Sequence, residues 1–475
     1  MKKIKLVRLG DSHYEWIIFG GGGSSDFKKI MLSCLTQPNT GKWHSSPAFK
    51  ISFIIIVSAL IFLIPSFKYL FPFMILIWQL FLILRKNRDH GRFLFQWVLI
   101  ALFLRFAYLC IVQFVPVKYH QPPFFFLDDK SYHSWSANIA ERWHQGEMPR
   151  VWTDAEVGTL QTGYYYFVSG IYYVFGANPF LPLFLNPFLG ALLCILVYRL
   201  AQIVFHDNME TRSVILVACN PVFWFWSSFV LKDTLLTLFF ILTLVLYLEY
   251  RLSRNALRLF FFCLASYFLA LLRIHSLFAV VLTILVYELM IPAGKKRVLV
   301  FCFLSVVIAL VGRYFTLVRD IEDQIVYSFL NALPDAGRTH LGALKYIIKG
   351  IPRLFLAPYA WVFADYFTAQ YFLYPGQWFL YLYVLPFAVS GAVQIVKENR
   401  TICLFILFPI IVKGSLYLMV LSGSAQRHMV ELMPLITILA AYGIKKRLTQ
   451  KFMILYFGCL IGFMLVQFAG IVLGK

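Results

Sequence analysis

Residues 93–116 read FLFQWVLIALFLRFAYLCIVQFVP, and residues 124–146 follow as FFFLDDKSYHSWSANIAERWHQG. The first stretch is apolar around a single cation, Arg105. It exceeds the roughly 20 residues that a helix needs to cross about 30 Å of hydrocarbon. The second stretch opens with two adjacent carboxylates, Asp128 and Asp129, and its apolar residues recur with helical spacing. We therefore expect a membrane-spanning helix followed by a helix that lies in the membrane interface.

The rest of the chain continues this apolar pattern. Of its 475 residues, 60% are hydrophobic and only 14% are charged, whereas soluble domains carry about 25% charged residues. Sustained apolar runs recur from Ile51 to Leu473. The composition excludes an ordinary soluble protein and predicts an all-α polytopic membrane protein with about 13 transmembrane helices.

The predicted organisation has five regions along the chain. They are a cytoplasmic polar tail (1–50), two additional amino-terminal transmembrane helices (51–92), a transmembrane core that includes an outward loop at 117–180 (93–317), an outward-facing segment (318–375) and the carboxyl-terminal transmembrane helices (376–475).

The net charge of +21 comes from short basic clusters between apolar segments, such as those at 85–92, 251–258 and 445–451. Cytoplasmic loops carry such an excess of Lys and Arg and lie against anionic lipid. This distribution places 117–180 and 318–375 on the outer face. It indicates membrane lipids rather than nucleic acid as the partner, and we expect a multi-pass protein of a plasma membrane, with a bacterial cell membrane as the default.

Ionisable side chains at membrane depth are costly and are candidates for function. In the predicted topology they gather near the outer ends of the helices, and they are Arg105, Lys232, Arg273, Lys413, Arg427 and His428. Such a layer of cations indicates a site for an anion, for which phosphate is suited. Simpler interpretations stay open: Arg105 can snorkel or pair with an acid, and Lys232 can pair with Asp233 at a hairpin tip. Arg427 can pair with Glu431, one turn after it.

The acidic pair has the chemistry of a general base. Adjacent carboxylates can raise one another's pKa, which suits proton transfer near neutral pH. We assign Asp128 as the base and place Asp129 second. A capping role for one or both stays open, because Asp is common at the start of a helix. The pair could also hold a divalent metal, but the sequence has no second carboxylate cluster, so we expect neither a metal nor another cofactor.

The order of these motifs resembles a known superfamily. LFLRF within an apolar helix precedes D-D-x-x-Y, which is followed by TGYYYFVSGIYYVFG (162–176), SSFVLKDT (227–234) and RHMVELMPLITILAAYG (427–443). This ordered set, over roughly 93–446, resembles the GT-C superfamily of integral-membrane glycosyltransferases, close to its protein mannosyltransferase and lipid A aminoarabinose transferase branches. The two additional amino-terminal helices, the polar tail and the segment 318–375 depart from that pattern.

The resemblance implies a lipid-phosphate-linked sugar donor, an outward-facing site and the acidic pair as catalytic residues. The chemistry agrees, because a phosphate leaving group needs fixed cations rather than a protonating acid. We expect transfer with inversion from an isoprenoid-phosphate-linked sugar to a hydroxyl or amine of a glycan, lipid or protein, with Lys413 and Arg427 nearest the phosphate. The alternatives are an envelope-glycan polymerase or ligase and a transporter or flippase of lipid-linked sugar.

Overall fold

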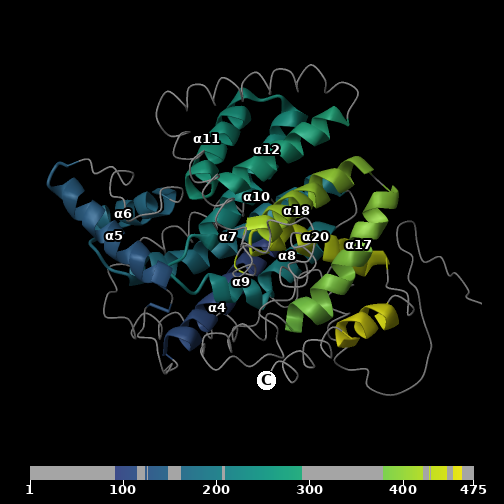
Figure 1. Cartoon of the computed structure of the whole chain (residues 1–475), viewed down its shortest axis with the longest axis horizontal. Helices are drawn as coiled ribbons and strands as arrows, with labels where there is room; N and C mark the ends of the chain where they lie inside the picture. Colours follow the sequence, from purple (N-terminus) through teal and green to yellow (C-terminus); the bar gives the residue numbers. More distant parts are fainter. Residues whose placement is uncertain are drawn as a thin grey trace, which may run out of the picture. The chain divides into compact units, whose positions relative to one another are not determined.

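The computed structural model describes residues 91–114, 124–125, 127–147, 162–205, 209–290, 378–398, 400–420, 427, 429–446 and 453–462 (Figure 1). All of them belong to one compact unit, Lys68–Lys475. The predicted polar tail (1–50), nearly all of the predicted first two transmembrane helices (51–92), the outward segment 318–375 and His428 lie outside the described residues.

Every regular element in the described part of the chain is helical, which confirms the predicted all-α class there. The helices are α4 (Gly91–Phe114), α5 (Leu127–His144), α6 (Thr162–Phe175), α7 (Phe180–Val204), α8 (Met209–Ala218), α9 (Pro221–Trp226), α10 (Asp233–Ser253), α11 (Ala256–Leu272), α12 (Ile274–Leu289), the π-helical turn η5 (Leu380–Val384), α17 (Leu385–Glu398), α18 (Arg400–Val420) and α20 (Met433–Lys446).

Three of the described helices, α4, α7 and α10, are long and apolar enough to cross a membrane by length and composition. Shorter apolar helices, among them α11 and α12, accompany them. The membrane-embedded character predicted from the sequence therefore holds, while the total of about 13 spans stays a prediction.

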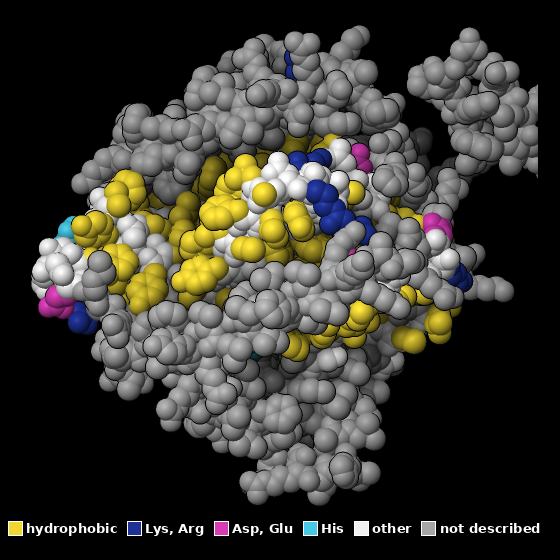
Figure 2. Space-filling model, turned by 90° about the horizontal axis from the view of Figure 1, so that it is seen from above, with side chains coloured by type: hydrophobic (Ala, Val, Ile, Leu, Met, Phe, Trp, Pro, Cys, Tyr) yellow, Lys and Arg dark blue, Asp and Glu magenta, His cyan; other side chains and the backbone are white. Residues whose placement is uncertain are grey.

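The described surface is largely apolar. On α11, for example, Leu257, Phe260 and Tyr267 are each more than half exposed. Figure 2 shows that hydrophobic side chains cover most of the described part of one face, with one larger group of Lys and Arg side chains among them. Large exposed apolar patches are rare on soluble monomers, whereas lipid tails accommodate them. This surface is typical of a protein that contacts lipid.

Helix α7 lies at the centre of the packing and contacts α4, α8 and α10. In the 18-residue apolar stretch of α7, 67% of the residues are buried, whereas 33% are buried in the corresponding stretch of α4. Helix α7 is therefore more deeply buried than α4. Helices α17 and α20 cross closely through glycines: a Cβ added at Gly391 would lie 2.0 Å from the Leu439 carbonyl oxygen. Small residues of this kind let helix backbones approach in membranes.

Helices α5 and α6 pack against each other beside this bundle (Figure 1). The Tyr132 ring of α5 meets the Tyr164 ring of α6 edge to face, with centroids 4.8 Å apart, and Ser136 Oγ donates to the Tyr165 carbonyl oxygen at 3.1 Å. The α5 helix begins where the sequence predicts the interfacial helix, and its first turn carries Asp128 and Asp129.

Candidate functional site

The amino-terminal end of α10 is the structural centre of the site. Asp233, its first residue, is fully buried. The chain before it is held by Asn186 of α7, whose Nδ2 donates to the carbonyl oxygens of Phe229 (2.5 Å) and Leu231 (3.1 Å). A buried amide that satisfies two loop carbonyls determines the path of the chain into α10, and it thereby sets the position of Lys232 and Asp233.

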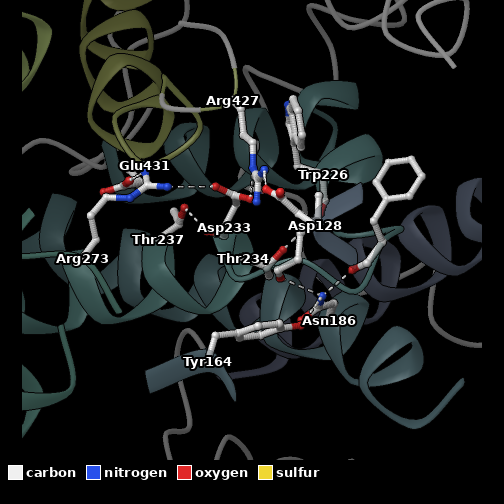
Figure 3. A network of polar contacts seen from close by, with 12 residues as sticks. Asp128, Tyr164, Asn186, Trp226, Asp233, Thr234, Thr237, Arg273, Arg427 and Glu431 are labelled. Carbon is white, nitrogen blue, oxygen red and sulfur yellow. Dashed lines mark hydrogen bonds and ion pairs between the residues drawn. The ribbon is translucent and has the colours of Figure 1, made fainter. Parts of the chain in front are cut away.

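Arg427 joins this end of α10 to the first turn of α5. Its Nε donates to Asp233 Oδ2 at 2.6 Å, and its Nη1 donates to Asp128 Oδ2. Figure 3 shows Arg427 pointing between the two carboxylates. Its remaining terminal nitrogen, Nη2, has no hydrogen-bond partner among the described residues. The N–H groups on this buried nitrogen are therefore not used by any described residue.

A second ion-pair group lies beside the first. Arg273, between α11 and α12, forms an ion pair with Asp233 at 3.6 Å and donates through Nη1 to Glu431. Glu431 also accepts from Ser276 Oγ at 2.7 Å and pairs with Lys413 of α18. Asp233 is thus shared by Arg427 and Arg273, and Glu431 by Arg273 and Lys413. A continuous network of charge-assisted contacts links α5, α10, α18 and the segment before α20.

Burial differs sharply across this network. The side chains of Asp233, Lys413 and Glu431 are fully buried, and Arg273 is 6% exposed. Asp128 is 53% exposed and its partner Arg427 is 18% exposed. The half-exposed carboxylate of Asp128 is therefore the member of the network that a molecule from outside can reach.

The two adjacent carboxylates predicted as a catalytic pair have different surroundings. Asp129 is fully buried, and its Oδ2 accepts a hydrogen bond from the Phe125 backbone N–H at 2.8 Å. This contact ties the incoming chain to the first turn of α5, and the predicted role of Asp129 beside the base stays a prediction. Asp128 turns instead toward Arg427.

The structure brings together four of the predicted phosphate-binding residues and separates a fifth. Arg427, Arg273 and Lys413 belong to the network, and the buried Lys232 directly precedes Asp233. Arg105, on α4, has no described contact with these residues: its Nη1 donates to the Ala101 carbonyl oxygen at 3.1 Å and its guanidinium lies 5.9 Å from the Phe223 ring centroid.

The sequence interpretation gave Asp233 and Glu431 only secondary parts, yet they hold the cations in place. Among the interpretations that the sequence leaves open, Lys232 is the partner of Asp233, and Arg427 is the partner of Glu431. The described contacts pair Asp233 with Arg427 and Arg273, and Glu431 with Arg273 and Lys413. The sequence did contain a signal for both carboxylates, because acidic residues within apolar segments are as unusual at membrane depth as cations.

An apolar cavity of about 480 Å³ lies beside the first turns of α10 and the end of α11. It lies among α6, α7, α10 and α11, and its lining residues are Gly163, Tyr166, Phe167, Leu189, Leu235, Leu238, Phe239, Phe268, Leu271 and Leu272. Leu235 is two residues beyond Asp233, and Leu272 directly precedes Arg273. The cavity is therefore lined at one end by residues that are close in sequence to Asp233 and Arg273, and its lining consists of hydrocarbon and aromatic side chains together with Gly163.

In the described ranges, no three or more His, Cys, Asp or Glu side chains lie together as metal ligands would. No protein-family model and no curated protein matches the chain.

Proposed function

We propose that the protein is a membrane glycosyltransferase that moves a sugar from a polyprenyl-phosphate-linked donor to an acceptor hydroxyl or amine at the outer face of the membrane. The observation that carries the proposal is the half-exposed Asp128 carboxylate beside Arg427, with an apolar cavity at the same end of α10. The reaction involves a lipid chain, a phosphate group and an acceptor, and the site offers a match for each: an apolar cavity for the lipid of the donor, cations for its phosphate and a carboxylate for the proton of the acceptor.

The apolar lining of the 480 Å³ cavity suits the lipid of the donor, because an isoprenoid chain carries no polar group. Its phosphate would then lie at the end of the cavity near Leu235 and Leu272, next to Arg273 and Arg427. Arg427 Nη2 supplies N–H groups that no described residue uses. A guanidinium that is already anchored by a buried carboxylate needs little reorganisation when charge develops on a ligand.

The proposed reaction is a single displacement. The acceptor oxygen or nitrogen forms a bond to the anomeric carbon, and the bond from that carbon to the phosphate oxygen breaks. The acceptor proton passes to Asp128, and the electron pair of the broken bond stays on the polyprenyl phosphate. Arg427, Arg273 and Lys413 stabilise that charge electrostatically. Attack opposite the leaving group inverts the anomeric centre.

The resemblance of the ordered motifs to the GT-C superfamily supports the same proposal. A transporter of lipid-linked sugar would also bind the phosphate, but it needs no proton acceptor at Asp128. A polymerase or ligase would use the same base with a larger acceptor. The role of Asp128 therefore separates transfer from transport.

The test is transfer by the purified protein in nanodiscs, with radiolabelled polyprenyl-phosphate sugars as donors and extracted envelope lipids and glycans as acceptors. Asp128→Asn should lower the rate roughly 10²–10⁴-fold, the usual loss when a general base is removed. Glu147→Gln is the matched control, because Glu147 is also 53% exposed and also pairs with an arginine, Arg142. Equal rates for Asp128→Asn and Glu147→Gln would contradict the proposal.

A further inference from the structure

The 480 Å³ cavity follows α10 and α11 for little more than one helical turn. Its lining residues on these helices are Leu235, Leu238 and Phe239 of α10, and Phe268, Leu271 and Leu272 of α11. Each set has the spacing of one helix face, and four residues of a helix rise about 6 Å. Cavities of about 300–1,000 Å³ hold ligands of drug size. The cavity therefore has room for a short segment of a hydrocarbon chain and not for a whole polyprenyl chain.

The two ends of the cavity have different surroundings. Asp233 and Arg273 form an ion pair at 3.6 Å, which brings the start of α10 beside the end of α11. Leu235 and Leu272, which are close to that pair in sequence, are 4% and 2% exposed. This end of the cavity is therefore buried, and it is the end nearer to the ion pair.

Phe239 and Phe268 mark the opposite end, about one turn farther along each helix. Because α10 and α11 pack against each other in opposite directions, the two rings meet, with their centroids 5.4 Å apart. Phe268 is 42% exposed and its neighbour Tyr267 is 58% exposed, so this part of α11 belongs to the apolar surface of the described residues. Phe268 therefore borders both the cavity and the surface that we expect to contact lipid.

We propose that Phe239 and Phe268 determine how much of the donor lipid the protein recognises. The proposal rests on the proposed function, because the occupant of the cavity is the isoprenoid chain of that donor. The isoprene units nearest the phosphate lie beside Leu235 and Leu272, and the chain leaves the protein for the bilayer at the two phenylalanines. Donors with a short chain and donors with a long chain should therefore bind about equally well.

The physical reason is that lipid tails are as apolar as the side chains of a membrane helix. An isoprene unit that stays in the bilayer has the same surroundings in the free and the bound donor, so it adds nothing to the affinity. A unit inside the cavity contributes through close packing with the walls, because an unfilled space loses those dispersion contacts. The affinity should therefore rise with chain length only until the cavity is filled.

The experiment measures binding to the purified full chain in nanodiscs. The probe is farnesyl phosphate that carries a photoreactive diazirine at the end remote from the phosphate, and mass spectrometry locates the label after irradiation. We expect the label in the peptides that contain Phe239 or Phe268. At equal mole fraction, unlabelled farnesyl phosphate and a polyprenyl phosphate several times longer should compete with the probe to within about threefold of each other.

Two tryptophan substitutions on α10 test the length limit. Leu238→Trp fills the cavity and should weaken the binding of farnesyl phosphate and of the longer chain alike, by about tenfold or more. Leu242→Trp is the matched control, because Leu242 is half-buried one turn farther along the same face and does not line the cavity. This variant should leave the binding of both chains unchanged.

A substitution at Phe268 tests the aromatic pair directly. Phe268→Ala removes the wall between the cavity and the lipid-facing surface, so the probe should bind about fivefold more weakly or worse through lost packing contacts. Phe261→Ala is the matched control: Phe261 lies on the same helix, is 45% exposed and does not line the cavity. It should bind the probe as the wild type does.

A label outside the helices that line the cavity would contradict the proposal. Equal competition by phosphatidylglycerol would also contradict it, because the cavity would then hold ordinary lipid chains. Tighter binding of the longer chain that weakens in Leu242→Trp would show that recognition continues past the phenylalanines. If Leu238→Trp does not fold, the label position and the comparison of chain lengths in the wild type decide. A protein that passes these binding tests but transfers no sugar would refute the proposed function alone.

Discussion

Asp128 and Asp233 both bind Arg427, but we expect losses of stability of very different size when each is replaced by Asn. Asp128 is 53% exposed, and exposed ion pairs contribute about 0.2–1 kcal/mol. Asp233 is fully buried and is shared by Arg427 and Arg273. Removing one partner of a buried pair leaves uncompensated charge and costs about 3–5 kcal/mol.

Asp128→Asn should therefore lower the free energy of unfolding by less than about 1 kcal/mol. The same substitution should reduce transfer about 10²–10⁴-fold, because Asn cannot accept the proton. Asp233→Asn should lower the free energy of unfolding by about 3 kcal/mol, the low end of the range, because the two arginines it leaves keep their other partners, Asp128 and Glu431.

The assay pairs thermal unfolding in detergent with single-turnover transfer in nanodiscs, on the same preparations. A double-mutant cycle with Arg427→Gln isolates each pairwise interaction, and the coupling with Asp233 should exceed the coupling with Asp128. The reasoning is refuted if Asp128→Asn destabilises as much as Asp233→Asn, or if Asp128→Asn transfers sugar at the wild-type rate.

Three further predictions concern the cation, the topology and pH. Arg427→Lys should restore only part of the donor affinity and turnover lost in Arg427→Gln, because the forked geometry of the guanidinium is lost; full recovery in donor-binding and transfer assays would show that charge alone is needed. In a background without native cysteines, an impermeant maleimide added to intact cells should label Lys130→Cys and not Lys446→Cys, and the reverse labelling would invert the topology. Burial lowers the pKa of His133, whose Nδ1 lies 2.9 Å from the Tyr172 hydroxyl oxygen. The neutral form is thus favoured in the fold, so the contribution of His133 to stability is present above its ordinary pKa of about 6.5 and is lost as pH falls below it. Melting temperatures at pH 7.5 and 5.5 should fall less in His133→Gln than in wild type, and an equal fall would contradict this assignment.

Local residue patterns were sufficient to predict much of the described architecture. The apolar run around Arg105 predicted α4, and its helix is long enough to span a membrane. The acidic pair after it predicted a new helix, and α5 begins at Leu127. Both predictions rest on interactions between residues that are close in sequence, namely the hydrophobic period of a helix and the signals at its start.

The pairing of charges depended on tertiary structure. Arg427 is 299 residues from Asp128 and 194 from Asp233, and no local rule connects positions so far apart. The nearest acid in sequence, Glu431, pairs with Arg273 and Lys413. A charged side chain in an apolar interior takes the opposite charge that the helix packing brings to it, because leaving that charge unpaired costs more than a contact with a close neighbour in sequence contributes.

The sequence by itself thus determined that the described part of the chain is helical and apolar, and that Asp128 and Asp233 lie in the first turns of their helices. Only the tertiary structure distinguished the buried Asp129, which binds the backbone of Phe125, from the half-exposed Asp128, which binds Arg427. Adjacent residues on a helix point about 100° apart. Their neighbours, and hence their chemistry, depend on which other helices pack against each side.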